Sequence, residues 1–460
     1  MPDQDLAYTS LTEVSARIRR KRLSPIELTL SCLARIEASN SRLNAFITVT
    51  AESALGQARV LEDEVQHGHW RGPLHGVPVA LKDLFDTAGV KTTAASAVFK
   101  DRVPTKDAEV VRRLKAAGAI ILGKLNMDEF AFSFTSETSY FGPVHNPWKL
   151  THTPGGSSGG PAAAVAAGLC NAALGSDTGG SIRQPAAFCG IVGLKPSYGL
   201  VSNRGVMPLA WSLDHVGPMT RTVEDAALVL QVIAGYDADD PCSAREETPD
   251  YGRALNSIRV KRLRVGVARP FFYEELHPEI AQATEAALAV LSSLTAGTFD
   301  VQLPETADTP VLIAEAYAWH ETLLAQHRAL YHPRTVYWLE QGARVTMPQY
   351  TRARQKMLRL RREAARVFEK VDVVVTPTTP QPPIALQSGR EPDLVLLRNA
   401  IPFNLLDLPT VSLACGFTQD GLPIGLQLSG PRLGEARVLA LGQAYERATR
   451  WHSQSPAGRI

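Results

Sequence analysis

Segments patterned like helices alternate with segments patterned like buried strands along this chain, and that alternation most constrains its fold. Residues 108–118, "AEVVRRLKAAG", have the pattern of a helix that ends at Gly118, and the apolar "AIILG" (119–123) behind them is typical of a buried strand. The order recurs in "IAQATEAALAVLSSL" (280–294) followed by "FDVQL" (299–303). This alternation predicts an α/β fold: a single large domain with a central mixed, mostly parallel β-sheet covered by helices on both faces.

The two ends of the chain fit the same scheme. In the mainly helical first 70 residues, Ser24 is the expected N-cap of a helix, with Pro25 at its first position and Glu27 completing a capping box. Strands are expected at 43–49 and 77–83. The later expected elements are a long basic helix at about 350–371, strands at 410–417 and 422–428, and a final helix at 434–451; the Pro-rich 377–392 is expected to be a surface loop.

Charge and cysteine usage exclude several classes of protein. The 48 basic and 46 acidic residues give a net charge of +2 and are interspersed, so neither a nucleic acid nor an anionic membrane is implied as partner. The five cysteines include no CxxC pair and no Cys/His cluster of metal-ligand spacing, which predicts free thiols and no metal. The N-terminus lacks the pattern of a signal peptide, and the longest small-apolar stretch (161–174) is too short to span a bilayer, so we expect a soluble, cytoplasmic protein.

Residues 155–159 spell GxSxG, the nucleophile-elbow pattern of α/β-hydrolases. An elbow needs a strand that runs directly into the serine. The preceding "NPWKLTHTP" (146–154) contains two prolines and no apolar run, so Ser157 is not expected to be an elbow nucleophile. The segment 118–125 approaches a phosphate-binding loop but ends in Leu125 rather than Ser or Thr, so no nucleotide cofactor is predicted.

A second glycine and serine cluster, "LGSDTGGSIRQPAAFCG" (174–190), suits acyl chemistry better. Gly179 and Gly180 let successive backbone N–H groups point at one spot, as in an oxyanion hole, and Ser181 follows them. A plain glycine turn before a helix is the alternative. Lys82 ends an apolar strand, where burial would lower its pKa toward that of a usable base; the alternative is a solvated surface lysine.

Five long segments together resemble the amidase signature family of serine hydrolases: "GVPVALKDLFDTAG", "GKLNMDEFAFS", "PGGSSGGPAAAVAAG", "GSDTGGSIRQPAAFCGIVGLKPSYGLVS" and "SLDHVGPMTRTVEDAALVL". The resemblance runs from about residue 10 to about residue 450. It implies the amidase signature fold over 1–460, with a helical region at 1–70, a catalytic core at 73–235, and a variable half at 236–460 that lines the substrate pocket and completes the sheet.

The resemblance also implies a Ser-cis-Ser-Lys triad. Ser181 matches the acylated nucleophile, Ser157 the relay serine that the family holds in a cis peptide, and Lys82 the base. No histidine is then needed for proton transfer, and no cofactor or metal is implied. The expected oxyanion-hole donors are the backbone N–H groups of Thr178, Gly179, Gly180 and Ser181. The expected supporting residues are Ser158, Asp177 and Arg183.

Among members of the family, a stand-alone amidase is favoured over the A subunit of a glutamine-dependent tRNA amidotransferase. That subunit's tyrosine-rich segment has no good counterpart in "PQYTRARQKMLRLRREAARVF" (348–368). The predicted function is hydrolysis of the C–N bond of linear aryl or alkyl amides and anilides, with carbamates (a urethanase activity) and esters as further substrates. The alternatives are a non-catalytic binding protein on the same fold, which is a different class, or the amidotransferase A subunit.

A small-molecule amide or carbamate is thus the expected partner, and homodimer formation is left open. The expected pocket residues are Met127, Phe130, Phe134 and Tyr140, although the alternating spacing of such aromatic residues fits core packing equally well. Trp319, His320 and the loop 377–401 are expected at the pocket rim.

Overall fold

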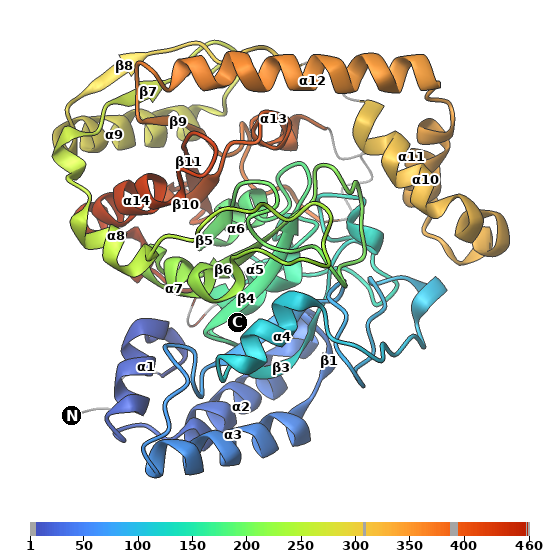
Figure 1. Cartoon of the computed structure of the whole chain (residues 1–460), viewed down its shortest axis with the longest axis vertical. Helices are drawn as coiled ribbons and strands as arrows, with labels where there is room; N and C mark the ends of the chain where they lie inside the picture. The colour runs from blue at the N-terminus through green and yellow to red at the C-terminus, as the bar shows by residue number, and fades with distance from the viewer. Residues whose placement is uncertain (1–5, 307–309, 387–393, 457, 459–460) are drawn as a thin grey trace.

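The computed structural model describes residues 6–306, 310–386, 394–456 and 458. Within them, 11 strands form one sheet in the order β1-β3-β2-β4-β6-β5-β10-β11-β9-β7-β8 (Figure 1). The strands are β1 (Phe46–Val49), β2 (Pro78–Lys82), β3 (Ile120–Leu125), β4 (Ala172–Asp177), β5 (Val192–Lys195), β6 (His215–Thr220), β7 (Val265–Val267), β8 (Thr298–Asp300), β9 (Val373–Pro377), β10 (Thr410–Phe417) and β11 (Pro423–Ser429). The predicted surface loop 377–392 is corrected at its start, because Pro377 is the last residue of β9 and residues 378–380 are buried, while 387–392 lie outside the described residues.

The sheet is mixed, as predicted, but it is not mostly parallel. Four of its described pairings are parallel, including β2 with β3 and with β4, and six are antiparallel. The connections explain the difference. A short turn joins β10 to β11, and a short turn can link only antiparallel neighbours, whereas β2, β3 and β4 are separated by long crossovers.

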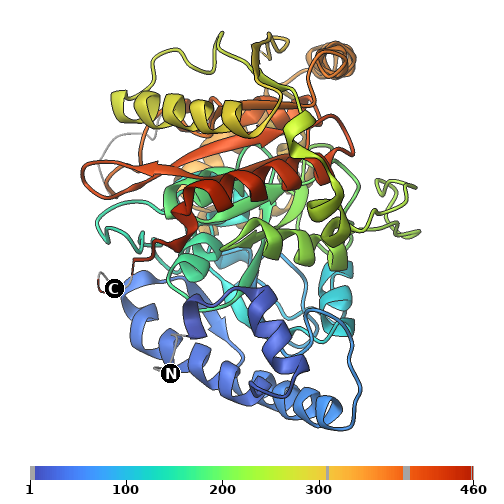
Figure 2. The ribbon, with the colours of Figure 1, turned by 90° about the vertical axis from the view of Figure 1, so that its left-hand side faces the viewer.

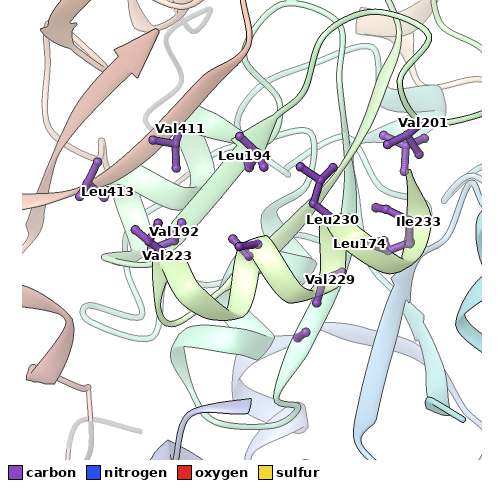
Figure 3. Close-up of a cluster of buried hydrophobic side chains, with 14 of the residues drawn as sticks. Leu174, Val192, Leu194, Val201, Val223, Val229, Leu230, Ile233, Val411 and Leu413 are labelled. Atoms are coloured by element: carbon purple, nitrogen blue, oxygen red, sulfur yellow. The ribbon is translucent and has the colours of Figure 1, made fainter. Parts of the chain in front are cut away.

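Helices cover both faces of the sheet (Figures 1 and 2). Along β2, Val79 and Leu81 join one core cluster while Ala80 joins the other, because successive side chains of a strand point to opposite faces. The first face packs against α7 (Val223–Ile233), α9 (Pro278–Leu294) and α14 (Glu435–Thr449), and Figure 3 shows Leu230 and Ile233 of α7 beside Leu174 and Leu194 of the sheet. The second face packs against α2 (Pro25–Leu43), α3 (Ala51–Gln66), α5 (Gly159–Ala166) and α6 (Arg183–Cys189).

The predicted N-cap of α2 is confirmed, although among the described hydrogen bonds the Glu27 side chain does not complete the capping box. The Ser24 hydroxyl accepts hydrogen bonds from the backbone N–H groups of Ile26 and Glu27, and Pro25 is the first helical residue. The helix continues through Leu43 and ends at Asn44, whose φ of 51° is left-handed. The strand predicted at 43–49 is therefore shortened to β1, because its first residues belong to the helix and its cap.

Further helices extend from one side of the molecule (Figure 1). α10 (Pro310–His327) and α11 (Pro333–Ala343) pack against each other, and α12 (Met347–Val367) is the predicted basic helix, starting three residues earlier than expected. The other helices are α1 (Leu11–Arg19), α4 (Glu109–Ala116), α8 (Tyr251–Ser257) and α13 (Ile401–Leu405). Across the described residues, no helix is both long and apolar enough to cross a membrane.

Candidate active site

Lys82 is the last residue of β2, and its side chain is completely buried. β2 runs parallel to β4, so the carboxyl ends of both strands meet at one edge of the sheet, where Ser176 and Asp177 end β4. The Lys82 Nζ donates hydrogen bonds to the Oγ atoms of Ser157 and Ser176, each at 2.8 Å. The parallel pairing of β2 with β4 therefore places Lys82 in contact with Ser157 of the glycine and serine cluster at 155–159.

Burial lowers the pKa of Lys82 to about 7. Removing an ammonium group from water disfavours its charged form, and this effect outweighs the opposing influence of the carboxylates of Asp128, Asp177 and Asp214. A lysine in this setting is neutral in a large fraction of molecules near neutral pH. It can therefore accept a proton from a hydroxyl group.

Ser157 lies in a tight turn that leads straight into α5. The peptide bond between Gly156 and Ser157 is cis, as the resemblance implied. Gly156 has no room for a side chain, because a Cβ atom there would lie 2.2 Å from Asp128 Oδ2. Among the described residues no strand precedes this turn after β3 ends at Leu125, which agrees with the prediction that GxSxG is not a nucleophile elbow here.

Ser181 follows β4 at the end of the loop 178–181. The Ser181 carbonyl oxygen accepts a hydrogen bond from the Ser158 N–H at 3.2 Å, so the two serine clusters lie side by side. The Ser158 hydroxyl in turn donates to the Ser176 carbonyl oxygen at 3.2 Å. Among the described hydrogen bonds, none joins the Ser157 and Ser181 hydroxyls.

The expected set of oxyanion-hole donors needs one correction. The Gly180 N–H donates to Asp177 Oδ1 at 2.8 Å, because that buried carboxylate needs hydrogen-bond donors, so this group is not free to bind an oxyanion. Within the described residues, the N–H groups of Thr178, Gly179 and Ser181 have no such acceptor. The two glycines still serve the turn, since Gly180 adopts a φ of +126°.

Asp177 and Arg183 form a fully buried ion pair behind this loop. Arg183 Nη2 lies 2.9 Å from Asp177 Oδ1, and the second carboxylate oxygen accepts the backbone N–H of Ile182 at 3.1 Å. Burial alone would raise the pKa of Asp177, but the Arg183 guanidinium and the Asn404 amide hold it well below its usual range. Through these contacts the pair holds the loop, and the supporting role expected for both residues stays a prediction.

Several neighbours of the site were not anticipated from sequence. Ser176, in the quoted segment 174–190, bonds to Lys82, and the Thr178 hydroxyl donates to Asp214 Oδ1 at 2.6 Å. Burial raises the pKa of Asp214 to about 6. The Asp128 carboxylate lies against Gly156. The Asn404 side-chain oxygen accepts a hydrogen bond from Arg183, which lies more than 200 residues away in the chain. The pairing of Leu81 with Leu174 places Ser176 one residue beyond the position opposite Lys82, so alternation does not signal their contact, and nothing local in the sequence signals Asn404.

The histidines take no part in this constellation. His215 lies buried beside it, but its Nδ1 is within hydrogen-bonding distance of the carbonyl oxygens of Leu213 and Asp177. His320 bonds to the Tyr331 hydroxyl, and burial lowers its pKa to about 3. No histidine nitrogen of the described residues hydrogen bonds to Lys82, Ser157 or Ser181.

The structure separates the four expected pocket residues. Phe134 is buried with Leu396, Leu397 and Phe188, whereas Met127 lies in the main core. Phe130 stacks on Tyr331 at 5.3 Å and packs against Trp319 and His320 of α10, so it fixes that helix. Tyr140 is 55% exposed and contacts Phe141.

Residues 396–401, here called the wall segment, pack against the Ser181 loop through the apolar side chains of Leu397, Ala400 and Ile401. A Cβ atom placed on Gly180 would lie 2.6 Å from the Cβ of Ala400 and 3.2 Å from Leu397 Cδ2, and one on Gly179 would lie 3.3 Å from Ile401 Cγ1. Leu397 retains 9% exposure, and Ile401 is partly exposed. The wall segment falls within the loop expected at the pocket rim.

Comparison with known proteins agrees with this arrangement. The family model Amidase matches residues 27–439. The A subunit of the glutamyl-tRNA(Gln) amidotransferase of Moorella thermoacetica is 42% identical over 98% of this chain and 99% of its own length.

Two solved structures are similar over nearly the whole chain. One, described as an unexpected vestigial protein complex that reveals the evolutionary origins of an s-triazine catabolic enzyme, has a TM-score of 0.91 and 32% identity, covering 96% of this chain and 99% of that one. The other, a crystal structure of an amidase, has a TM-score of 0.87 and 35% identity, and the match covers 96% of this chain and 100% of that chain. The family model covers most of the chain, and the chain belongs to the amidase family.

Proposed function

We propose that this chain is a serine amidase that hydrolyses the C–N bond of small apolar amides through an acyl-enzyme on Ser181. The observation that supports it most is the hydrogen bond from the fully buried Lys82 Nζ to Ser157 Oγ, at 2.8 Å, next to the Ser181 loop. A buried lysine whose pKa is about 7 and that contacts a serine has the properties of a general base.

Acylation begins with proton transfer along this contact. Neutral Lys82 takes the proton of Ser157, which takes that of Ser181 as its Oγ attacks the amide carbonyl carbon. The carbonyl oxygen becomes an oxyanion held by the N–H groups of Thr178, Gly179 and Ser181. The C–N bond then breaks, and the same chain run in reverse returns the proton from Lys82 through Ser157 to the leaving amine.

Deacylation repeats the sequence with water. Lys82 and Ser157 remove one proton from water, its oxygen attacks the acyl carbon, and the bond to Ser181 Oγ breaks as that atom regains the proton. The net reaction consumes one water and releases a carboxylic acid and an amine. An ester or a carbamate presents the same carbonyl to the same donors, so both are proposed as further substrates.

The character of the wall segment supports an apolar substrate. Leu397, Ala400 and Ile401 face the two glycines of the Ser181 loop, and the nearby Phe134 extends the apolar surface. A charged group placed against this surface would lose its hydration without gaining a partner, which is costly.

A second candidate function is the A subunit of a tRNA amidotransferase, because the Moorella thermoacetica relative at 42% identity has that name. Such a subunit would bind free glutamine, which carries an ammonium and a carboxylate close to its side-chain amide. The charged side chains behind the loop, Asp177 and Arg183, are already paired with each other. We therefore favour the stand-alone amidase, which works without partner subunits.

The test is release of aromatic amine from a short-chain acyl anilide by the purified chain alone, with glutamine offered in parallel. We expect anilide turnover that disappears in Ser181→Ala and persists in His320→Asn, whose histidine lies outside the triad. Ammonia release from glutamine, with no anilide turnover, would favour the amidotransferase subunit.

A non-catalytic binding protein is tested separately by labelling with a fluorophosphonate. Its phosphorus forms a bond to a serine oxygen as fluoride leaves, so it reports the nucleophile without substrate turnover. We expect labelling of the wild-type chain and none of Ser181→Ala. An unlabelled, folded wild-type chain would favour the binding protein.

A further inference from the structure

The side chains of the wall segment lie directly against the nucleophile loop. Leu397 and Ala400 fill the space beside Gly180, so a side chain at position 180 of this loop would collide with them. Leu397 also belongs to an apolar cluster with Phe134 and Phe188, yet it keeps 9% exposure. Leu397 is largely buried and contacts the loop that bears the nucleophile, so only the small exposed part of its surface is left for a substrate.

A buried polar bridge fixes the distance between this wall and the loop. Arg183, whose side chain is fully buried, donates from Nη1 to the Ala400 carbonyl oxygen at 2.9 Å and to Gln427 Oε1 at 3.2 Å. The Gln427 amide nitrogen in turn donates to the Asn399 carbonyl oxygen at 2.7 Å. Two consecutive carbonyl groups of the wall segment are therefore held by one guanidinium and one amide.

The other end of the bridge holds the loop itself. Asp177 binds Arg183 and also accepts the Gly180 N–H, and Asn404 bonds to both members of the ion pair. The side chains in this chain of contacts are buried, so displacing one leaves others without partners where water does not reach them. The wall and the nucleophile loop are therefore expected to move as one rigid unit.

The amine and the acyl group of the substrate are expected to occupy opposite sides of the site. The amine leaves where it can receive a proton, which is the side of Ser157 and Lys82, whose hydrogen bonds go to each other and to Ser176. The backbone carbonyl groups of Ala400 and Asn399 in the wall segment accept hydrogen bonds instead from Arg183 and Gln427. Because the amine occupies the side of Ser157 and Lys82, the acyl group of the substrate faces the wall segment.

We propose that Leu397 is a specificity-determining residue that selects apolar acyl groups, and that Gln427 is a positioning residue that keeps it at a fixed distance from the nucleophile loop. This inference rests on the proposed function, because it concerns the acyl side of the same site. A contact of this kind contributes about 1 to 3 kcal/mol, or roughly 10-fold to 200-fold, to discrimination between chain lengths.

The experiment measures the rate of inactivation by an ethyl and by a decyl fluorophosphonate, whose alkyl group occupies the acyl side. The ratio of the two rates does not depend on how much of the chain is active. We expect Leu397→Ala and Leu397→Asn to lower the decyl preference at least about fivefold, because each removes apolar contact that only the long chain makes. The matched control is Leu406→Ala, a buried leucine in a different cluster, which should leave the ratio unchanged.

Gln427→Met tests the positioning role. We expect it to lower the decyl rate more than the ethyl rate, since the short probe does not reach the wall. An equal fall in both rates would overturn the positioning role, because a purely structural defect affects both probes alike.

The remaining outcomes separate this inference from the proposed function. A wild-type chain labelled at Ser181 whose ratio is unchanged by Leu397→Ala and Leu397→Asn would overturn the specificity role and leave the proposed function standing. An effect of Leu397→Ala confined to anilides that vary in the amine would overturn the assignment to the acyl side. Absence of Ser181 labelling in the wild type would overturn both.

Discussion

The pKa of Lys82 predicts how the activity of this chain depends on pH. Only the neutral amine can accept the Ser157 proton, and the pKa is lowered from 10.5 to about 7 by burial. One pH unit below that value, about one eleventh of the molecules carry a neutral lysine, and one unit above it about ten elevenths do. We therefore expect kcat/KM to rise about tenfold per pH unit below the pKa and to level off above it.

The assay is anilide hydrolysis at low substrate concentration from about pH 5.5 to about pH 9, since kcat/KM reports the ionisation of the free enzyme. A second buried lysine provides the control. Burial also lowers the pKa of Lys195 to about 7, but its Nζ hydrogen bonds only to the Pro196 carbonyl oxygen among the described atoms. Lys195→Met should keep the acidic limb in place.

Two results would refute this reasoning. A wild-type profile that is flat below pH 8, or that rises only near the ordinary pKa of a lysine, would mean that Lys82 does not act as the base. A limb that disappears in Lys195→Met, while the variant remains folded, would assign the titration to the other lysine.

Three further changes have defined outcomes. Asp128→Asn removes a negative charge that raises the pKa of Lys82, so the acidic limb should move to lower pH; a shift to higher pH would contradict the electrostatics. Gly156→Ala would place a Cβ atom 2.2 Å from Asp128 Oδ2, so we expect a lower melting temperature and almost no anilide turnover. The control is Gly56→Ala, whose Cβ would meet nothing within 4 Å and which should retain turnover. Wild-type turnover in Gly156→Ala would refute the packing argument. Burial raises the pKa of Glu446 from 4.5 to about 8, so its stabilising protonated state is fully present below the unfolded pKa and lost as pH rises through the folded one. Glu446→Gln should therefore raise the unfolding free energy at about pH 9 by as much as about 5 kcal/mol and change it little at about pH 4, as measured by urea denaturation; an equal gain at both pH values would exclude ionisation as the cause.

Local patterns in the sequence predict the elements whose signals are local. The strand predicted at 410–417 coincides with β10, and the cap at Ser24 is in place. β6 was not predicted, because Gly217 and Pro218 within it argue against a strand unless the neighbouring strands are known. Its backbone pairs with β4 and β5 on either side, which is a tertiary effect.

In the candidate site too, residues with a local sequence signal could be predicted and residues brought in by tertiary contacts could not. Lys82, Ser157 and Ser181 could be predicted as site residues because each belongs to a long ordered segment that resembles the family. The aromatic run could not be divided in advance: Phe134 lies near the wall segment, while Phe130 packs against α10. The roles of Gln427 and Asn404 could not be predicted, because their partner Arg183 lies 244 and 221 residues away in the chain.

That separation along the chain bears on how the protein is made. During synthesis, Lys82, Ser157 and Ser181 emerge from the ribosome long before the residues that surround Arg183. Until Asn404 and Gln427 follow, the guanidinium lacks the partners that let it be buried, so the nascent core stays incomplete through most of translation. A premature stop between Ser181 and Gln427 should yield a chain that contains Lys82, Ser157 and Ser181 but cannot assemble the site, and the late, non-local closure predicts slow folding.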